Sequence, residues 1–178
     1  TLVRGVVINR ASNTGLDFQG ASGGSWVEGS YFGLDYAGAA ISTINNTGVL
    51  VQSNSITVGG ALPAARNIIS GANNYALFLS GVSGAVVRGN YIGTDATGTN
   101  DRFNGSYALL STGSPSPTIG GAGAGEGNLL SGADTGYGLY LNGSAELVQG
   151  NRIGSDGTGT SAIPNSVGVY VFGSTGAL

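Results

Sequence analysis

A segment of about 61 residues repeats along the chain, and a fixed period of that size is typical of solenoid proteins. Asn67–Ala72 returns as Asn128–Ala133, and Val87–Asp95 returns as Val148–Asp156. A more divergent copy, Val27–Asp35, precedes both. The sequence therefore predicts a single domain, residues 1–178. Its three repeats span about 1–65, 66–126 and 127–178.

Each repeat contains two short segments in which apolar residues alternate with others, as in a half-buried strand. Gly, Asn or Ser bounds every segment, which leaves no room for a helix of ordinary length. The segments recur about every 30 residues, the length of one solenoid coil with its corner loops. We expect an all-β fold, a right-handed parallel β-helix (β-solenoid) of about six coils, with no cap at either end. The pairs expected to face inward are Leu16/Phe18, Val49/Val51, Leu77/Leu79, Ala108/Leu110, Leu139/Leu141 and Val169/Val171.

Asparagines also recur at the repeat period. Stacked coils place equivalent residues above one another, so recurrent Asn side chains predict hydrogen-bonded ladders. The expected columns are Asn90 and Asn151 with Ser30, Asn67 and Asn128, and Asn45, Asn104 and Asn165.

The composition excludes several functional classes. The chain has 6 Lys+Arg against 9 Asp+Glu, and charged residues make up 8%, too few for a basic nucleic-acid surface. His and Cys are absent, which removes His general bases and Cys/His metal sites. No apolar run approaches the roughly 18 residues of a membrane helix, so membrane insertion is not expected. We expect a non-catalytic protein without a cofactor.

Three motifs carry a family resemblance: Gly89–Thr99, Thr118–Gly121 and Gly127–Gly132. Together they resemble the right-handed parallel β-helix repeats of large secreted or surface-anchored bacterial proteins, with a pectin-lyase-like solenoid fold. The resemblance implies the fold and an extracellular or cell-surface location. It implies no activity, although polysaccharide enzymes share this fold.

The recurrent acids Asp35, Asp95 and Asp156 are the first candidates for chemistry. Neighbours lie two coils apart, about 9.5 Å, which is too wide for a retaining pair of glycosidase carboxylates. An Asp followed by Gly and Thr more simply predicts an Asx-turn that holds a loop. Asp95 and Asp101 are the candidates for a weak Ca²⁺ site. Arg88 is expected in a surface ion pair with Asp95.

The residue between the two inward positions of each strand must point outward. These outward residues are mostly apolar or aromatic, which predicts an exposed stripe for a partner. A covering corner loop and sugar stacking are the alternatives. The candidates on one strand column are Leu50, Phe78, Leu109, Tyr140 and Tyr170, and those on the next are Tyr31 and Tyr91.

The two ends of the chain look complementary. Thr1–Val3 resembles Thr118–Ile119, the stretch expected to follow the last residues under the repeat period. We therefore expect a structural extracellular subunit that stacks head to tail with itself, through Leu2, Val3, Ala177 and Leu178. The alternatives are a segment of a surface adhesin or stalk, and a carbohydrate-binding or polysaccharide-processing β-helix whose site lies elsewhere.

Overall fold

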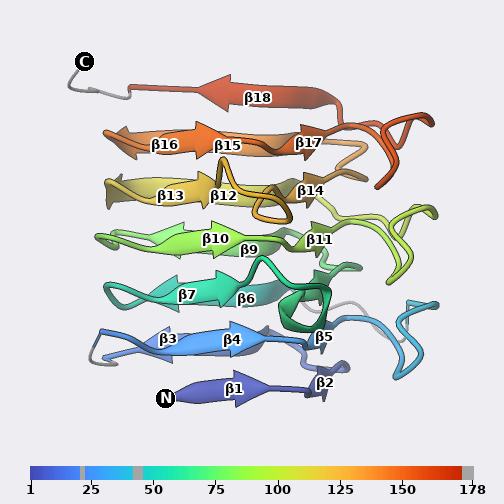
Figure 1. Ribbon diagram of the computed structural model, residues 1–178, viewed down its shortest axis with the longest axis horizontal. Coiled ribbons are helices and arrows are strands. Elements are labelled where there is room, and N and C mark those ends of the chain that lie inside the picture. The colour runs from blue at the N-terminus through green and yellow to red at the C-terminus, as the bar shows by residue number, and fades with distance from the viewer. Residues whose placement is uncertain (21–22, 42–45, 174–178) are drawn as a thin grey trace.

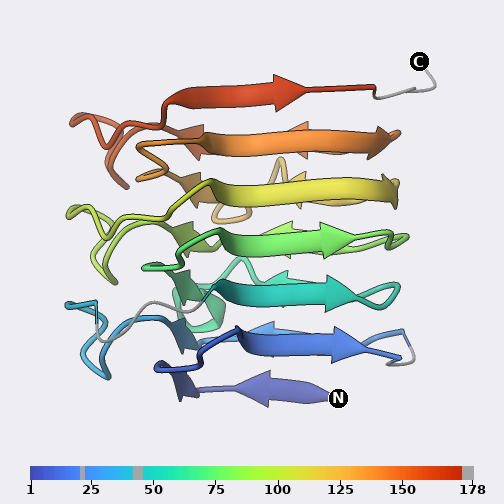
Figure 2. The same cartoon turned by 180° about the vertical axis from the view of Figure 1, so that it is seen from behind.

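The computed structural model describes residues 1–20, 23–41 and 46–173, and these wind into a right-handed β-solenoid (Figures 1 and 2). The solenoid makes about five turns of roughly 30 residues. Its coils stack along one axis, so that β1 (Leu2–Arg4) and β18 (Val167–Val171) lie at opposite ends. One 3-10 turn, η1 (Pro63–Ala65), is the only helical element of the described residues. The predicted all-β parallel solenoid is confirmed, with about five turns where about six coils are expected from the sequence.

Three parallel sheets, each with six strands in the described residues, form the walls of the solenoid. Sheet A contains β1, β4 (Trp26–Glu28), β7 (Thr57–Gly59), β10 (Val86–Arg88), β13 (Thr118–Gly120) and β16 (Leu147–Gln149). Sheet B contains β2 (Val7–Ile8), β5 (Tyr31–Phe32), β8 (Ile68–Ile69), β11 (Tyr91–Ile92), β14 (Leu129–Leu130) and β17 (Arg152–Ile153). Sheet C contains β3 (Thr14–Gln19), β6 (Thr47–Gln52), β9 (Tyr75–Ser80), β12 (Tyr107–Pro115), β15 (Tyr137–Ser144) and β18.

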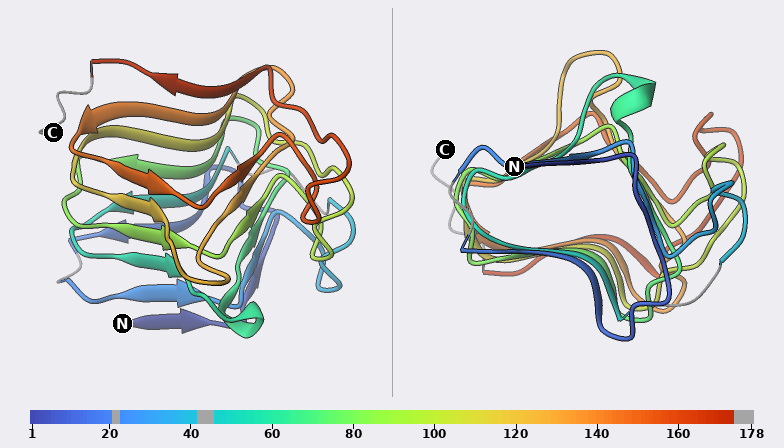
Figure 3. Two further views of the ribbon diagram at one scale, coloured as in Figure 1. Left: turned by 45° about the horizontal axis from the view of Figure 1, so that its top comes forward. Right: turned by 90° about the horizontal axis from the view of Figure 1, so that it is seen from below.

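The core lies inside the three sheets, whose walls enclose it in the end-on view of Figure 3. Its buried members extend from Phe18 to Leu141, and Phe32, Leu77 and Ile92 are fully buried. Burying each such side chain contributes roughly 1.5–3 kcal/mol. The last coil packs the partly buried side chains Val148 and Ile153 against this core. The interior is therefore continuous, and each coil depends on the coils above and below it.

The predicted alternation is wrong in the fourth strand of sheet C. Leu77 pairs with Leu109, which pairs with Leu139, so Leu109 faces inward and is fully buried. Leu110 takes the outward position that was assigned to Leu109. The two coils around Leu109 differ in length, and a shift of one residue in a strand exchanges its two faces.

Three loops project from the sheet B side of the stack (Figure 1). These Asp loops, residues 35–40, 95–100 and 156–161, are each closed by an antiparallel bridge, such as the bridge between Thr94 and Asp101. The Ala96 N–H donates to the Gly38 carbonyl oxygen at 2.9 Å, and the Gly157 N–H donates to the Gly98 carbonyl oxygen at 2.7 Å. Loops two coils apart therefore touch, which accounts for a sequence repeat of two coils.

Gly93 follows β11 where one coil passes close to the next. Its φ is +89°, and a Cβ at this position would overlap the carbonyl oxygen of Ser131 on the next coil. Only glycine combines this backbone conformation with so close an approach.

Candidate functional site

A continuous ladder of polar side chains runs through the buried corner between sheets A and B. Asn67 Nδ2 donates to Asn90 Oδ1 at 3.0 Å, and Asn90 Nδ2 donates to Asn128 Oδ1 at 3.0 Å. Asn128 Nδ2 continues the ladder to Asn151 Oδ1 at 2.9 Å, and the Ser30 N–H donates to Asn67 Oδ1. The two predicted columns are thus one ladder with a member on successive coils. Each buried amide is paired, so the ladder stabilises the stack.

The other predicted column is present in part. The Asn104 Oδ1 accepts from the Ala72 N–H, and the Asn165 Oδ1 accepts from the Ala133 N–H at 2.9 Å. Asn45 lies outside the described residues. Each of these asparagines therefore binds the backbone of the preceding coil, 32 residues earlier, and links two coils.

Asp95 closes its loop by accepting hydrogen bonds. Its Oδ1 accepts from the Thr97 hydroxyl at 2.6 Å and from the Thr99 N–H, and its Oδ2 accepts from Asn100 Nδ2 at 2.6 Å. Burial raises the pKa of Asp95, but the hydrogen bonds from Thr97 and Asn100 outweigh it, so the net pKa lies below 3.8. The carboxylate is thus held ionised as the loop anchor.

Asp35 and Asp156 anchor their loops in the same way. Backbone hydrogen bonds from Ala39 and Ala40 lower the pKa of Asp35. A side-chain hydrogen bond from Thr158 lowers the pKa of Asp156, whose Oδ1 accepts from that hydroxyl at 2.8 Å. The expected turn role describes the bonding of all three carboxylates.

The suggested Ca²⁺ site at Asp95 and Asp101 finds no geometric support. Asp95 is engaged by its own loop, and the Arg102 guanidinium lies 3.9 Å from its Oδ2. Asp101 Oδ1 accepts from the Phe103 N–H at 2.8 Å. Among the described residues, no three or more His, Cys, Asp or Glu side chains cluster as metal ligands. A cation would have to displace Arg102 and the loop donors.

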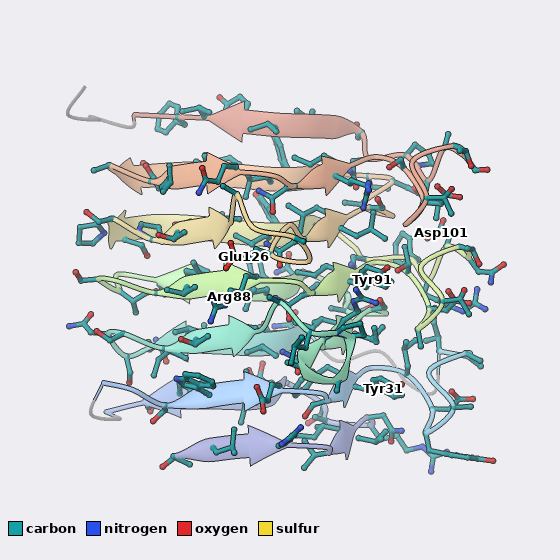
Figure 4. All side chains as sticks on the ribbon, viewed as in Figure 1. Tyr31, Arg88, Tyr91, Asp101 and Glu126 are labelled. Atoms are coloured by element: carbon teal, nitrogen blue, oxygen red, sulfur yellow. The ribbon has the colours of Figure 1, made fainter. Side chains whose placement is uncertain are left out.

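Arg88 contacts a different carboxylate from the one expected. Its Nη1 lies 3.1 Å from Glu126 Oε1, over sheet A (Figure 4), so the expected pair with Asp95 is wrong. Glu126 also accepts from the Gly123 N–H. The pair therefore fastens the loop between β13 and β14 to the strand β10 beneath it.

Tyr31 and Tyr91 lie under the Asp loops instead of forming an open stripe (Figure 4). A Cβ at Gly38 would lie 2.9 Å from Tyr31 Cε2, and one at Gly98 would lie 2.6 Å from Tyr91 Cε2. The Arg66 guanidinium also lies 3.8 Å from the centre of the Tyr91 ring, a cation–π contact. The alternative of a covering corner loop therefore describes both tyrosines.

The outer face of sheet C does carry an aromatic surface. Leu50, Phe78 and Tyr140 are half-buried in the outward column, and Tyr170 is 39% exposed. In the fourth coil the column holds Leu110, which is 6% exposed. With Leu110 in place of Leu109, these residues form one register column, but Leu110 is buried, so the column is not exposed along its whole length.

A second aromatic column, Tyr75, Tyr107 and Tyr137, runs beside the first and was not predicted. The rings stack with centroids 5.3 Å apart at each step, and Tyr140 packs edge-on against Tyr137 at 5.2 Å. Burial, followed by the neighbouring phenols, raises the pKa of Tyr107 above 10.0. The faces of these rings are covered by neighbouring rings and are not free to stack on a sugar. The column therefore serves to stabilise the stacked coils.

A shallow hollow lies between two Asp loops, and its lining contains one carboxylate, Asp101, and so no pair of carboxylates for acid–base catalysis. Its volume is about 360 Å³, and it is lined by Ala39, Ala40, Ile41, Asp101, Arg102 and Phe103. Arg102 donates to the Ala39 carbonyl oxygen there. Its charged groups therefore serve loop contacts.

The first and last coils expose apolar side chains. Leu2 is 57% exposed on β1, whereas Val3 is half-buried against the core. At the other end, Val169 on β18 is 47% exposed and Leu147 on β16 is 49% exposed. Ala177 and Leu178, the other expected contact residues, lie outside the described residues. No helix of the described part is long and apolar enough to cross a membrane.

Comparison with known proteins gave no match to a family model, a curated protein or a solved structure. The β-solenoid is therefore assigned from the structure itself.

Proposed function

We propose that the chain is a non-catalytic structural β-helix subunit that extends end to end with further copies of itself. The observation that carries this proposal is that the repeated polar columns bond within the stack. Asn90 bonds Asn128, Asp95 bonds its own loop, and Tyr107 stacks on Tyr137. In each case the side chain is engaged within the protein, either between coils or within its own loop, and is not presented to a ligand.

The register of the sheets supports end-to-end pairing. When the pairing of β13 with β16 is continued by one coil, β1 of a second copy lies on β16 and β3 lies on β18. This places Val3 over Val148, and Leu16 over Val169. Matching aliphatic residues would thus continue the core, while the open edges of β1 and β18 would gain backbone partners. A heterologous contact of this kind generates an open filament.

As part of the same proposal, we assign the solenoid to the pectin-lyase-like subtype and place it outside the cell or on the cell surface. The repeat motifs that resemble secreted and surface-anchored bacterial β-helices favour a pectin-lyase-like subtype and an extracellular or cell-surface place. A rigid rod with satisfied polar ladders suits such a role, because it needs neither disulfides nor a cofactor for its stability.

Sedimentation velocity of paired charge variants tests the proposal. Leu2 and Leu147 are exposed in one outward column and would become neighbours across the junction. We expect wild-type chains to sediment as long particles at high concentration. The Leu2→Glu/Leu147→Glu variant should sediment as monomers, because like charges directly opposite repel. The Leu2→Glu/Leu147→Arg variant should restore the long particles.

Circular dichroism of the three proteins provides the folding control, since both substituted positions are exposed. Identical sedimentation of all three folded proteins would overturn the end-to-end contact. The Leu2→Glu/Leu147→Arg variant also carries two charges. If it assembles, the loss of assembly in the Glu/Glu variant comes from repulsion across the junction and not from charge alone.

A further inference from the structure

Five of the eight tyrosines lie on the outer face of sheet C: Tyr75, Tyr107, Tyr137, Tyr140 and Tyr170. Consecutive rings contact one another, with centroids between 5.0 and 5.6 Å apart. Neither the core nor the polar ladders require hydroxyls in this column, because phenylalanine stacks equally well. A run of five contacting phenols therefore has a chemistry of its own.

The geometry points to an oxidative cross-linking site, in which Tyr140 and Tyr170 couple through their rings into a biphenol. The oxidant is hydrogen peroxide acting through a haem peroxidase, or an equivalent one-electron oxidant. This inference does not depend on end-to-end assembly.

The reaction balances within the pair. Each phenol loses one electron and one proton to form a phenoxyl radical, and the two hydrogen atoms reduce one peroxide to two water molecules. One carbon–carbon bond then forms between ring carbons adjacent to the hydroxyl-bearing carbons. The hydrogens on those two carbons move as protons to the oxygens, which restores both phenols. The protein thus loses two hydrogen atoms in total.

The placement of this pair favours coupling over other outcomes. Tyr140 and Tyr170 are direct partners in the register of β15 and β18, and their centroids lie 5.0 Å apart with planes at 31°. Tyr170 is 39% exposed, which admits an oxidant. Because the sheet holds both rings in one column, two radicals in this column are already neighbours.

Coupling would fasten two coils covalently. The bond would join positions on adjacent coils and so close a loop that the unfolded chain would otherwise leave open. The expected consequence is a rise in the thermal unfolding midpoint of the oxidised protein.

The test treats dilute wild-type protein with horseradish-type peroxidase and hydrogen peroxide, followed by peptide mapping with mass spectrometry. Tyr170→Phe keeps the ring and removes the hydroxyl. Tyr36→Phe is the matched control, because Tyr36 is 87% exposed and lies outside this column. Circular dichroism before oxidation verifies that all three proteins are folded.

We expect monomeric wild-type protein to contain a linked Tyr140–Tyr170 peptide pair that lacks two hydrogen atoms, with biphenol fluorescence. Tyr36→Phe should retain this pair and the raised unfolding midpoint, and Tyr170→Phe should lose both. A wild-type product without this pair, whether uncoupled or coupled only between molecules through Tyr36, would overturn the inference. So would an unchanged yield of biphenol and an unchanged midpoint shift in Tyr170→Phe.

Discussion

Asn90 donates its side-chain amide to Asn128 on the next coil, with 3.0 Å between Nδ2 and Oδ1. The same oxygen also accepts the Asn90 backbone N–H at 3.0 Å. One side chain therefore satisfies two donors at a corner where Asn90 and Asn128 are both buried.

Replacing Asn128 by Ala should lower the free energy of unfolding by about 1–3 kcal/mol, because it leaves the buried Asn90 N–H without an acceptor. Urea denaturation followed by circular dichroism measures this change. Asn73→Ala is the control, since Asn73 is exposed, and it should change stability by less than about 0.5 kcal/mol. Equal effects at the two positions would contradict the structural role of the ladder.

The corrected register of β12 makes a second prediction. Leu109 is fully buried, so Leu109→Ala should cost about 2–5 kcal/mol through lost burial and a residual cavity. Leu50 is half-buried in the outward column, and Leu50→Ala should cost about 1 kcal/mol or less. Chemical denaturation of both variants decides the assignment. A larger loss of stability in Leu50→Ala than in Leu109→Ala would mean that Leu50 faces the core and that the inward and outward faces are exchanged.

Gly93 is expected to tolerate no side chain. Gly93→Ala combines a strained φ with overlap on the Ser131 carbonyl oxygen, so it should cost at least about 3 kcal/mol. Gly81 also has a positive φ, +65°, but a Cβ at this position would have no neighbour within 4 Å, so Gly81→Ala should cost only about 1–2 kcal/mol. Thermal unfolding of both variants measures the difference, which is the contribution of close coil stacking. Similar midpoints would show that the coils can separate at Gly93 without loss.

The Asp loops predict a loss of stability in acid. Burial raises the pKa of Asp95, but hydrogen bonds from Thr97 and Asn100 bring it below 3.8 in the folded protein. The unfolded chain therefore binds more protons in acid, so this contribution is present above pH 3.8 and is lost as the pH falls through the folded pKa. Asp95→Asn should make the acid loss shallower in unfolding experiments at a series of pH values.

Asp134 provides a control of opposite sign. Burial, and then the charge of Asp101, raises the pKa of Asp134 above 3.8. The folded protein therefore holds this proton more tightly, and the contribution of Asp134 to stability increases as the pH falls. Asp134→Asn should steepen the net acid loss slightly, whereas Asp95→Asn should reduce it. The same change of slope in both variants would argue against the assigned bonding.

The sequence was sufficient for the architecture because the repeat, the short segments and their spacing leave few alternatives. It was not sufficient for register. In β12 the apolar run Ala108–Leu110 fits the alternation in either phase, so the sequence alone places Leu109 on the wrong face. Tyr75, Tyr107 and Tyr137 lie outside the alternating pairs, so the alternation does not predict their column. The available signal is a Tyr two residues before each of Leu77, Leu109 and Leu139.

Two further features depend on how loops are distributed between coils. The steps of the asparagine ladder alternate, with 23 residues from Asn67 to Asn90 and 38 from Asn90 to Asn128. A single fixed period therefore predicts two columns, whereas the structure has one ladder. The sequence also located the Asp loops, but the path that brings Gly98 onto Tyr91 depends on contacts between loops two coils apart.

The central claim is that coils of one copy continue onto coils of the next. Fibre diffraction or cryo-electron microscopy of the concentrated protein tests it most directly. Six strands in each sheet, at about 4.8 Å per coil, predict unbranched fibres with an axial subunit repeat of about 29 Å. Discrete particles one subunit long at all concentrations, or fibres with an unrelated axial repeat, would contradict the account.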